Sequence, residues 1–341
     1  YSSLFSSVLV SAVNQDARDT GKLHLESVEL FKEYKKIVVV MDESILGSEF
    51  KVKFKKNTIN TIVYPGITYS GANVSAASNY FFRKAVLVGD EIVQIASLFE
   101  LAHEKSYYTV YIDNQGVLKD HGAKNYMDKA ELSFVDSVIS NVDIASYDRD
   151  GTALQQILSL LNTPRKTFIY INKFGAHVPY NKTIPPRLCK ESRMEDYQTS
   201  VQVNSIAFLD RLASNMKSDT IVFYTSDHGQ NFGKGPAAGN TGDDAAESEW
   251  DVPFALATGD ANFIEQLKSS EVFERKFITH FEIAELVRNV LGYQMKGKRS
   301  IFEIQSTRKD EQSYCGHYGP PFNVLSNSAH NSRTCKVIDV H

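Results

Sequence analysis

The stretch "DTIVFYTSDHG", residues 219–229, places an acid and an imidazole side by side at the end of an apolar run. Its core, "IVFY", is rich in the β-branched and aromatic residues that favour a buried strand. A second stretch, "KIVVVMDES" (36–44), has the same form and ends in Asp42 and Glu43. Near-continuous apolar strands of this kind are typical of a parallel sheet that helices cover on both faces.

Strand and helix patterns alternate along the rest of the chain. Strand-like runs recur in "YYTVYIDN" (107–114), "KTFIYINK" (166–173) and "VPFALAT" (252–258), and apolar residues at helical spacing predict helices at 90–106, 151–162, 194–216 and 279–292. Thr279 and Glu282 have the spacing of a capping box at the start of the last helix. We therefore expect an α/β fold with a doubly wound, mostly parallel sheet and helices on both faces, in a single domain.

Composition excludes some classes of partner. The chain has 341 residues, of which 42% are hydrophobic and 23% charged, so it is long enough to bury a substantial core. Its net charge of -4 and its scattered Lys and Arg residues provide no basic field, so we expect no nucleic-acid partner. No stretch reaches the roughly 18 apolar residues that a membrane-spanning helix needs.

Cysteine spacing gives one prediction about the C-terminal part of the chain. Cys189, Cys315 and Cys335 show neither a CxxC motif nor the spacing of a zinc site. Cys315 and Cys335 lie in a segment rich in Gly, Pro, Ser and Asn, which a disulfide would stabilise in an oxidising compartment. The three cysteines do not identify the compartment.

The predicted strand ends carry candidate metal ligands. Because ligands gather at the carboxyl ends of strands in such sheets, Glu43, Asp227 and His228 are expected to meet at one edge. Two carboxylates and one imidazole suit zinc or another first-row divalent ion. The alternative for Asp42, beside Glu43, is a surface acid that caps the next helix.

A serine follows at the start of another predicted helix. The segment "YPGITYSGANVSAASNYFFRKAV" (64–86) opens a helix at about Ser75, so this hydroxyl would lie at a helix N-terminus, which favours phosphate or sulfate oxygens. A hydroxyl bound to a metal becomes a usable nucleophile at neutral pH. The alternative is that Ser75 or Ser78 only caps the helix.

The order of "VVVMDES", "SGANVSAAS", "GAH" and "YTSDHG" resembles the alkaline phosphatase and sulfatase superfamily over roughly residues 36–295. Within it the chain is most similar to the membrane-anchored phosphoethanolamine transferases that modify lipid A and lipooligosaccharide. Sulfatases carry a C/S-x-P-x-R motif at the nucleophile, and "SAASN" has neither this Pro nor this Arg.

The resemblance implies roles for particular residues. Glu43, Asp227 and His228 match the metal ligands, and Asp42 stands where that family often has glycine. Ser75 matches the threonine nucleophile, which is also a metal ligand, and Ser78 matches the serine three positions on. His177 matches a histidine that handles the phosphate or a second metal. Lys119 matches, with a gap, a basic residue near the phosphoryl group.

The chain also departs from the family's pattern. Gln230 stands where those enzymes have glutamate, and Asn240 stands where they have a histidine of the same loop. An amide is a poor zinc ligand, so one tight zinc site is expected and a second site stays open. With Ser78, these two residues are candidates for contact with substrate. No cysteine occurs at Ser70 or Tyr80, where the family has disulfide bridges.

The resemblance implies a zinc-dependent transfer of phosphoethanolamine from phosphatidylethanolamine to a hydroxyl of lipid A or core sugar, through a covalent Ser75 intermediate. Residues 1–35 would be a membrane-proximal linker or helix after a transmembrane region outside this sequence, and 36–341 the catalytic domain, in the periplasm at the bacterial inner membrane. An ordinary amphipathic helix is the alternative near Tyr1. The alternative functions are a metal-dependent phosphodiesterase or glycerophosphotransferase, and a non-catalytic relative that binds glycan or lipid.

Overall fold

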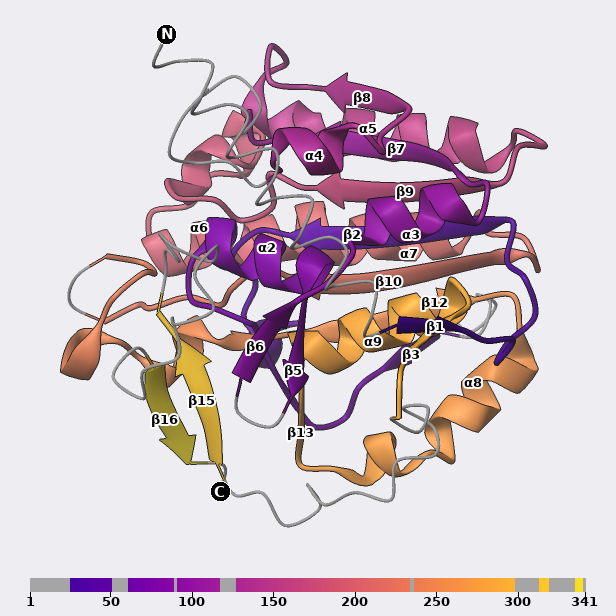
Figure 1. Ribbon diagram of the computed structural model, residues 1–341. Coiled ribbons are helices and arrows are strands. Elements are labelled where there is room, and N and C mark those ends of the chain that lie inside the picture. Colours follow the sequence, from indigo (N-terminus) through magenta and orange to yellow (C-terminus); the bar gives the residue numbers. More distant parts are fainter. Residues whose placement is uncertain are drawn as a thin grey trace, which may run out of the picture.

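A central seven-stranded sheet organises the computed structural model, which describes residues 25–50, 61–88, 91–116, 127–233, 236–297, 313–318 and 335–339 (Figure 1). In spatial order its strands are β3 (Thr61–Val63), β12 (Phe254–Thr258), β10 (Thr220–Ser226), β2 (Lys36–Asp42), β9 (Thr167–Asn172), β7 (Tyr108–Asp113) and β8 (Ser137–Ser140). β12 runs antiparallel to both its neighbours, whereas β10, β2, β9, β7 and β8 are parallel. The expected α/β fold with a mostly parallel sheet is therefore confirmed.

Helices cover both faces of this sheet, because residues of β2 alternate between two apolar clusters. Val39 and Met41 belong to the cluster that also contains side chains of α2 (Ser75–Lys84), α3 (Leu98–Glu104), α8 (Ala261–Lys268) and α9 (His280–Val290). Val38 and Val40 belong to the cluster with α5 (Ser146–Leu161), α6 (Arg193–Ser200) and α7 (Ala207–Ala213). A π-helical turn, Val201–Ile206, joins α6 to α7.

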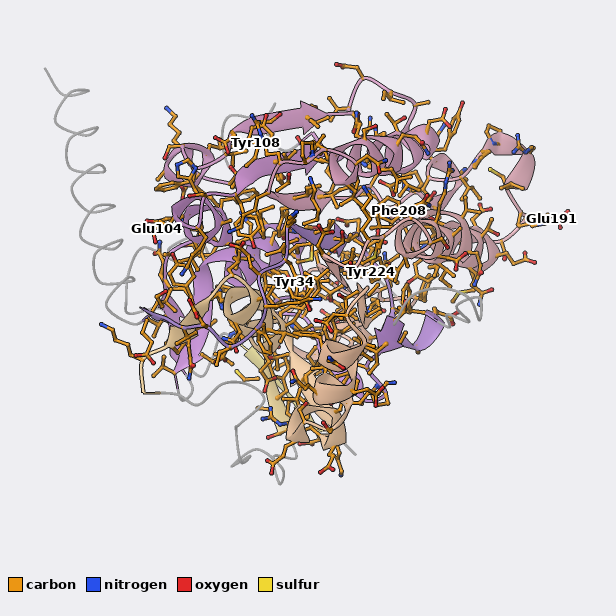
Figure 2. All side chains as sticks on the ribbon, turned by 90° about the vertical axis from the view of Figure 1, so that its right-hand side faces the viewer. Tyr34, Glu104, Tyr108, Glu191, Phe208 and Tyr224 are labelled. Atoms are coloured by element: carbon orange, nitrogen blue, oxygen red, sulfur yellow. The ribbon has the colours of Figure 1, made fainter. Side chains whose placement is uncertain are left out.

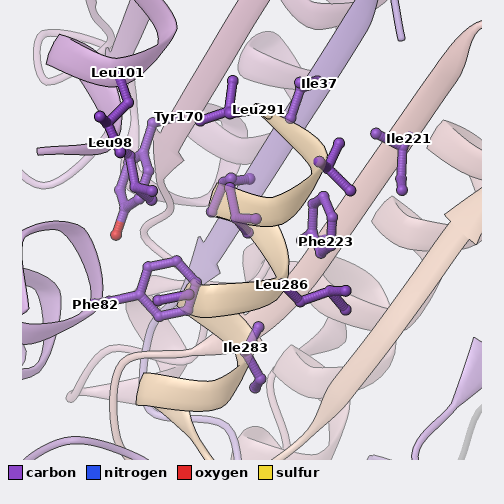
Figure 3. Packing of buried hydrophobic residues seen from close by; sticks show 14 of the residues in the cluster. Ile37, Phe82, Leu98, Leu101, Tyr170, Ile221, Phe223, Ile283, Leu286 and Leu291 are labelled. Atoms are coloured by element: carbon purple, nitrogen blue, oxygen red, sulfur yellow. The ribbon is translucent and has the colours of Figure 1, made fainter. Parts of the chain in front are cut away.

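Close packing of these apolar side chains holds the layers together. In Figure 3, Phe82 of α2 and Leu286 of α9 lie over Tyr170 and Phe223 of the sheet. Figure 2 shows side chains filling the space between the layers, with Tyr224 inside and Glu191 at the periphery. Burial of this apolar surface is the main term that favours the folded chain.

Smaller elements surround the central sheet. A three-stranded sheet contains β11 (Asp251–Val252), β4 (Ile67–Tyr69) and β13 (Phe277–Thr279). The antiparallel pairs are β1 (Leu25–Ser27) with β14 (Tyr293–Met295), β5 (Ala85–Val88) with β6 (Glu91–Gln94), and β15 (Ser313–His317) with β16 (Cys335–Asp339). The short helix α4 spans Lys129–Leu132, and 3-10 turns occur at Gly47–Glu49, Tyr180–Lys182, Pro186–Leu188, Gly242–Asp244, Glu247–Glu249 and Glu271–Glu274. Cys315 of β15 is disulfide-bonded, as its predicted environment allows, whereas Cys189 is a free, exposed cysteine.

Most predicted elements are present, but the first half of one predicted helix is a strand. Helices at 151–162, 194–216 and 279–292 are confirmed, and so is the capping box of Thr279 and Glu282. The predicted helix at 90–106 starts only at Leu98, because Glu91–Gln94 pairs as a strand with Ala85–Val88. The Ser97 hydroxyl caps the shortened helix by accepting a hydrogen bond from the Glu100 N–H at 3.1 Å.

The parallel register of β2 and β10 brings the two acidic strand ends together. Asp42 pairs with Ser226, so Glu43 and Asp227 are the next residues on neighbouring strands. Among the described residues, no helix is both long and apolar enough to cross a membrane. Of the expected segment 1–35, residues 1–24 lie outside the described part, whereas Leu25–Ser27 pairs with Tyr293–Met295 and Tyr34 is buried in the core. The expected boundary at residue 35 stays a prediction.

Candidate metal centre and nucleophile

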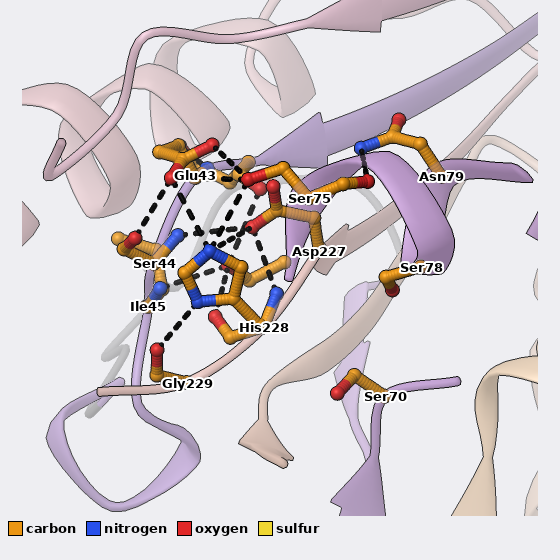
Figure 4. A network of polar contacts seen from close by, with 12 residues as sticks. Glu43, Ser44, Ile45, Ser70, Ser75, Ser78, Asn79, Asp227, His228 and Gly229 are labelled. Carbon is orange, nitrogen blue, oxygen red and sulfur yellow. Dashed lines mark hydrogen bonds and ion pairs between the residues drawn. The ribbon is translucent and has the colours of Figure 1, made fainter. Parts of the chain in front are cut away.

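Glu43, Asp227 and His228 form a buried cluster at the carboxyl end of β2 and β10. One ligand atom from each of the three lies within 4.8 Å of those of the other two. The His228 Nε2 atom lies 3.4 Å from Glu43 Oε1 and 3.9 Å from Asp227 Oδ1. The predicted meeting of these three side chains is therefore present, and Figure 4 shows them turned toward one another.

The Ser75 hydroxyl completes this group from the first position of α2. Its Oγ atom lies 3.2 Å from Glu43 Oε2 and 3.2 Å from His228 Nε2. The residue before the helix is Val74, and no side chain caps the helix there. The alternative that Ser75 is only a cap is thus wrong, because its hydroxyl is turned to the carboxylate and the imidazole.

Backbone contacts around Ser44 fix the two carboxylates. Ser44 has a φ of 62°, in the left-handed region that costs a non-glycine residue of order 1 kcal/mol or more. In this conformation its N–H donates to Asp227 Oδ1 at 3.1 Å, and its hydroxyl donates to Glu43 Oε1 at 2.9 Å. The His228 N–H also donates to Asp227 Oδ1, at 2.8 Å. One oxygen of Asp227 is therefore fully engaged.

The other oxygen of Asp227 fits a cation. Asp227 Oδ2 is buried and has no hydrogen-bond donor among the described residues. Burial and the charge of Glu43 raise the pKa of Asp227 well above its ordinary value. Two buried carboxylates at this separation repel each other unless positive charge lies between them. The donor set of two carboxylates, one imidazole and one hydroxyl suits zinc, so the residues fit such an ion.

In the absence of metal, a proton on His228 supplies this positive charge. Burial alone would lower the pKa of the His228 imidazole, but the charges of Asp227 and Glu43 and the hydrogen bond to Glu43 raise it to about 10. Burial alone would likewise raise the pKa of Glu43, yet the hydrogen bond and charge of His228, with the charge of His177, lower it. Without metal, the raised pKa of His228 favours a protonated imidazole beside the two carboxylates.

A second layer of polar contacts lies under Glu43, and sequence reasoning missed it. Gln115 donates from Nε2 to Glu43 Oε2 at 2.6 Å and to the Lys173 carbonyl at 2.7 Å. Lys173 is fully buried and pairs with Asp42 Oδ2 at 2.6 Å. Asp42 is thus no surface acid, and that alternative is wrong. Gln115 comes two residues after the end of β7, so its position near a strand end is the sequence signal that indicates it.

A glycine is required where the loop after β9 passes Asp42. Gly175 has a φ of 51°, and a Cβ atom there would lie 2.3 Å from Asp42 Oδ1. The Asp150 carboxylate accepts the N–H groups of Phe174 and Gly175, both at 2.9 Å. This loop carries His177, whose ring is exposed and stacks on Phe174 with the centroids 5.3 Å apart.

The remaining sequence candidates lie apart from the cluster or are engaged elsewhere. Ser78 faces the core, where its hydroxyl bonds His280 Nδ1 at 3.1 Å, and Figure 4 shows it away from the cluster. Both amide hydrogens of Asn240 are used, by Glu249 and by the Pro236 carbonyl. The Gln230 amide is buried and makes no hydrogen bond among the described residues. Lys119 lies outside the described residues.

Comparisons with known proteins agree with this layout. The model of the sulfatase family matches residues 68–264, which is more than half of the chain. No curated protein matches the chain.

Solved structures share the fold at low sequence identity. The C-terminal periplasmic domain of EcEptC from Escherichia coli superposes with a TM-score of 0.67 at 16% identity, covering 92% of this chain and 94% of that one. A complex of the same domain with zinc gives 0.68 at 16% identity and the same coverage. The soluble domain of lipooligosaccharide phosphoethanolamine transferase A from Neisseria meningitidis gives 0.61 at 14% identity, covering 82% and 95%.

Proposed function

The chain belongs to the sulfatase family, and from this premise we propose that it is a metal-dependent phosphoethanolamine transferase with Ser75 as its nucleophile. The observation that carries the proposal is the position of the Ser75 hydroxyl, 3.2 Å from both Glu43 and His228, at the N-terminus of α2. The fold shared with phosphoethanolamine transferase domains supports the choice of this activity within the family.

The metal of this proposal is zinc, held by Glu43, Ser75, Asp227 and His228. The buried oxygen of Asp227 that lacks a donor supports a cation at this place, and the zinc complex of the E. coli domain supports this identity. When bound, zinc supplies Lewis acidity, which lowers the pKa of a hydroxyl ligand and polarises a phosphoryl oxygen.

The reaction proceeds in two displacements at phosphorus. First, Ser75 Oγ forms a bond to the phosphorus of phosphatidylethanolamine, and the bond from phosphorus to the diacylglycerol oxygen breaks. The diacylglycerol leaves as an alcohol with the proton that Ser75 loses. Second, a sugar hydroxyl of the acceptor attacks phosphorus and gives up its proton as the bond to Ser75 Oγ breaks, so that the serine hydroxyl is restored.

Residues around Ser75 assist these displacements. The N–H groups of the first turn of α2, which have no partner within the helix itself, and the helix dipole stabilise the negative oxygens of the phosphoryl group. His177, on the loop that Asp150 holds, positions the phosphate or carries a proton. Lys119, Ser78, Gln230 and Asn240 stay proposals as substrate contacts, and for Asn240 the contact would use its side-chain oxygen because both amide hydrogens are engaged.

The proposed substrates are both attached to lipids. The donor is phosphatidylethanolamine, and the acceptor is a hydroxyl of lipid A or core sugar in a lipopolysaccharide or lipooligosaccharide. This proposal includes residues 1–35 as a membrane-proximal segment and a place for the catalytic domain in the periplasm, at the bacterial inner membrane. Another neisserial structure, described as the integral membrane protein lipooligosaccharide phosphoethanolamine transferase A, has a similar fold at 15% identity and supports this proposal.

Intact-protein mass spectrometry of the zinc-loaded protein after incubation with phosphatidylethanolamine tests the donor and the nucleophile together. We expect a phosphoethanolamine adduct on Ser75, and none in Ser75→Ala. The matched control is Ser48→Ala, which removes an exposed hydroxyl and should keep the adduct. Released phosphoethanolamine without an adduct would favour the hydrolase alternative. The enzyme proposal would be refuted by two results together: the wild-type protein binds no zinc at neutral pH, and Ser75→Ala has the same activity as the wild type.

A further inference from the structure

The Glu249 carboxylate is fully buried beside the candidate site and is surrounded by N–H donors. Its Oε1 atom accepts from Asn231 Nδ2 at 3.2 Å, Asn240 Nδ2 at 2.8 Å and the Ala246 N–H at 3.0 Å. Its Oε2 atom accepts from Asn73 Nδ2 at 2.8 Å and the Asn240 N–H at 3.1 Å. Five donors on one buried carboxylate make it the centre of a rigid network.

This network connects two segments that carry site residues. Asn73 lies two residues before Ser75, whereas Asn231 and Asn240 belong to the loop that follows His228. Two more bonds link the same segments, because Asn73 Nδ2 also donates to the Asn240 carbonyl at 2.8 Å and the Gly239 N–H donates to the Asn73 carbonyl at 3.0 Å. The turn before the nucleophile is therefore fastened to the loop after the metal ligands.

The backbone of Glu249 contacts the metal-ligand segment directly. Its carbonyl accepts from the Gly229 N–H at 2.9 Å, and the neighbouring Ser248 carbonyl accepts from the Gln230 N–H at 3.0 Å. The approach is so close that a Cβ atom at Gly229 would lie 2.0 Å from the Ser248 oxygen, which only glycine allows. Glu249 thus holds the residue after His228 with its backbone and the segment before Ser75 with its side chain.

We propose that Glu249 is a positioning residue, which fixes the Ser75 hydroxyl relative to His228 and the carboxylates through Asn73. The proposal rests on the function proposed above for Ser75. Glu249 contacts neither the substrate nor the metal; it sets the distance between the nucleophile and the ligands. A misplacement of about 1 Å at a reacting atom can lower a rate by about a hundredfold, so this control has a measurable effect.

The variant Glu249→Gln tests the side chain and leaves the backbone bond to Gly229 in place. Glutamine keeps the size but replaces one acceptor oxygen with a donor that faces the N–H groups of Asn73 and Asn240. We expect Ser75 adduct formation to slow by about ten- to a hundredfold, while zinc affinity falls no further than in Ser75→Ala, because Glu43, Asp227 and His228 stay in place. Glu247→Gln is the matched control, because this exposed acid of the same turn should be neutral.

A second variant, Asn73→Ala, tests the same connection if Glu249→Gln folds poorly. Asn73→Ala removes the Asn73 Nδ2 bonds and leaves its backbone bonds, so it should slow adduct formation similarly. The double variant should lose little more than the slower single one, because both changes break one connection. Three results would overturn the proposal: strictly additive losses, a rate within about threefold of the wild type in Glu249→Gln, or a loss of zinc affinity in Glu249→Gln greater than that in Ser75→Ala.

Cobalt substitution supplies a readout that does not depend on catalysis. The visible absorption of bound Co²⁺ reports its ligands and their geometry. We expect Glu249→Gln to shift the spectrum toward that of Ser75→Ala, whereas Glu247→Gln should match the wild type. If the wild type forms no adduct, the proposed function fails, but a shifted spectrum would still support the positioning role and an unshifted one would overturn it.

Discussion

Replacement of Lys173 by methionine should destabilise the protein strongly and disturb the metal ligands. The Lys173 ammonium is fully buried, with Nζ 2.6 Å from Asp42 Oδ2 and 3.6 Å from Asp150 Oδ2, and it donates to the Asn204 carbonyl at 2.6 Å. Its removal leaves two carboxylates without their cation in the interior. Breaking one buried pair in this way lowers the free energy of unfolding by about 3–5 kcal/mol. Because Lys173→Met leaves a second carboxylate unpaired as well, we expect a loss near the upper end of this range.

Equilibrium urea unfolding of the metal-free protein measures this cost. Lys166→Met is the matched control, because Lys166 pairs with the exposed Glu33 and such surface pairs contribute at most about 1 kcal/mol. Adding Asp42→Asn to Lys173→Met should recover part of the loss, since it removes one of the unpaired charges. A loss below about 1.5 kcal/mol, or no recovery in the double variant, would refute the reasoning.

The pH dependence of this loss has a definite sign. Burial raises the pKa of Asp42, and the Lys173 charge opposes that rise. Without Lys173 the folded state binds a proton on Asp42 more tightly than the unfolded state does. A folded-state pKa above the unfolded value means that stability is lost as pH rises. The deficit of Lys173→Met relative to the wild type should therefore shrink when the pH is lowered from 8 toward about 5.

Two further predictions concern protons at and beside the site. Asp227 and Glu43 raise the pKa of His228 to about 10 without metal, so zinc must displace the proton on His228 when it binds. Zinc affinity should therefore fall by about tenfold per pH unit between about pH 8 and pH 6. Chelator competition measures this affinity, and a pH-independent affinity would contradict the reasoning. Burial lowers the pKa of His280 from 6.5 to about 3, so on acidification the unfolded state binds a proton at this residue before the folded state does. Between these two pKa values, the unfolding free energy of the metal-free protein should fall by about 1.4 kcal/mol for each pH unit of acidification. Urea unfolding at several pH values measures this slope, and His280→Gln should lack the contribution.

The central strands could be predicted because their sequence signal is local. Runs such as "KIVVVMD" contain enough apolar residues for burial on both faces, and no distant partner is needed to recognise them. The segment 90–106 differs, since Ile92 and Val93 fit a helical apolar pattern as well as a strand. Pairing of β6 with the residues of β5 decided between the two, and that choice depends on tertiary structure.

The same distinction separates the site residues that were predicted from those that were missed. Glu43, Asp227 and His228 follow strand ends, so the fold class alone placed them at one edge. Gln115 and Glu249 act on partners that are distant in sequence, and single amide or acid residues at such separations leave no motif. Asn240 departs from the family's pattern, and the motif alone does not predict that its amide donates to Glu249.

The balance of charge around the cluster constrains when a phosphate group can enter the site. Glu43 and Asp227 lie at the centre, Asp42 and Asp150 share Lys173 beneath them, and Glu249 is buried beside them. A phosphodiester brings a further negative charge into this environment, where the effective dielectric constant is low and repulsion is strong. The α2 N-terminus contributes only a partial positive charge of about half a unit. The phosphate group of the proposed donor is therefore favoured next to Ser75 only when positive charge lies at the carboxylates, either the proton on His228 or a metal ion that displaces it.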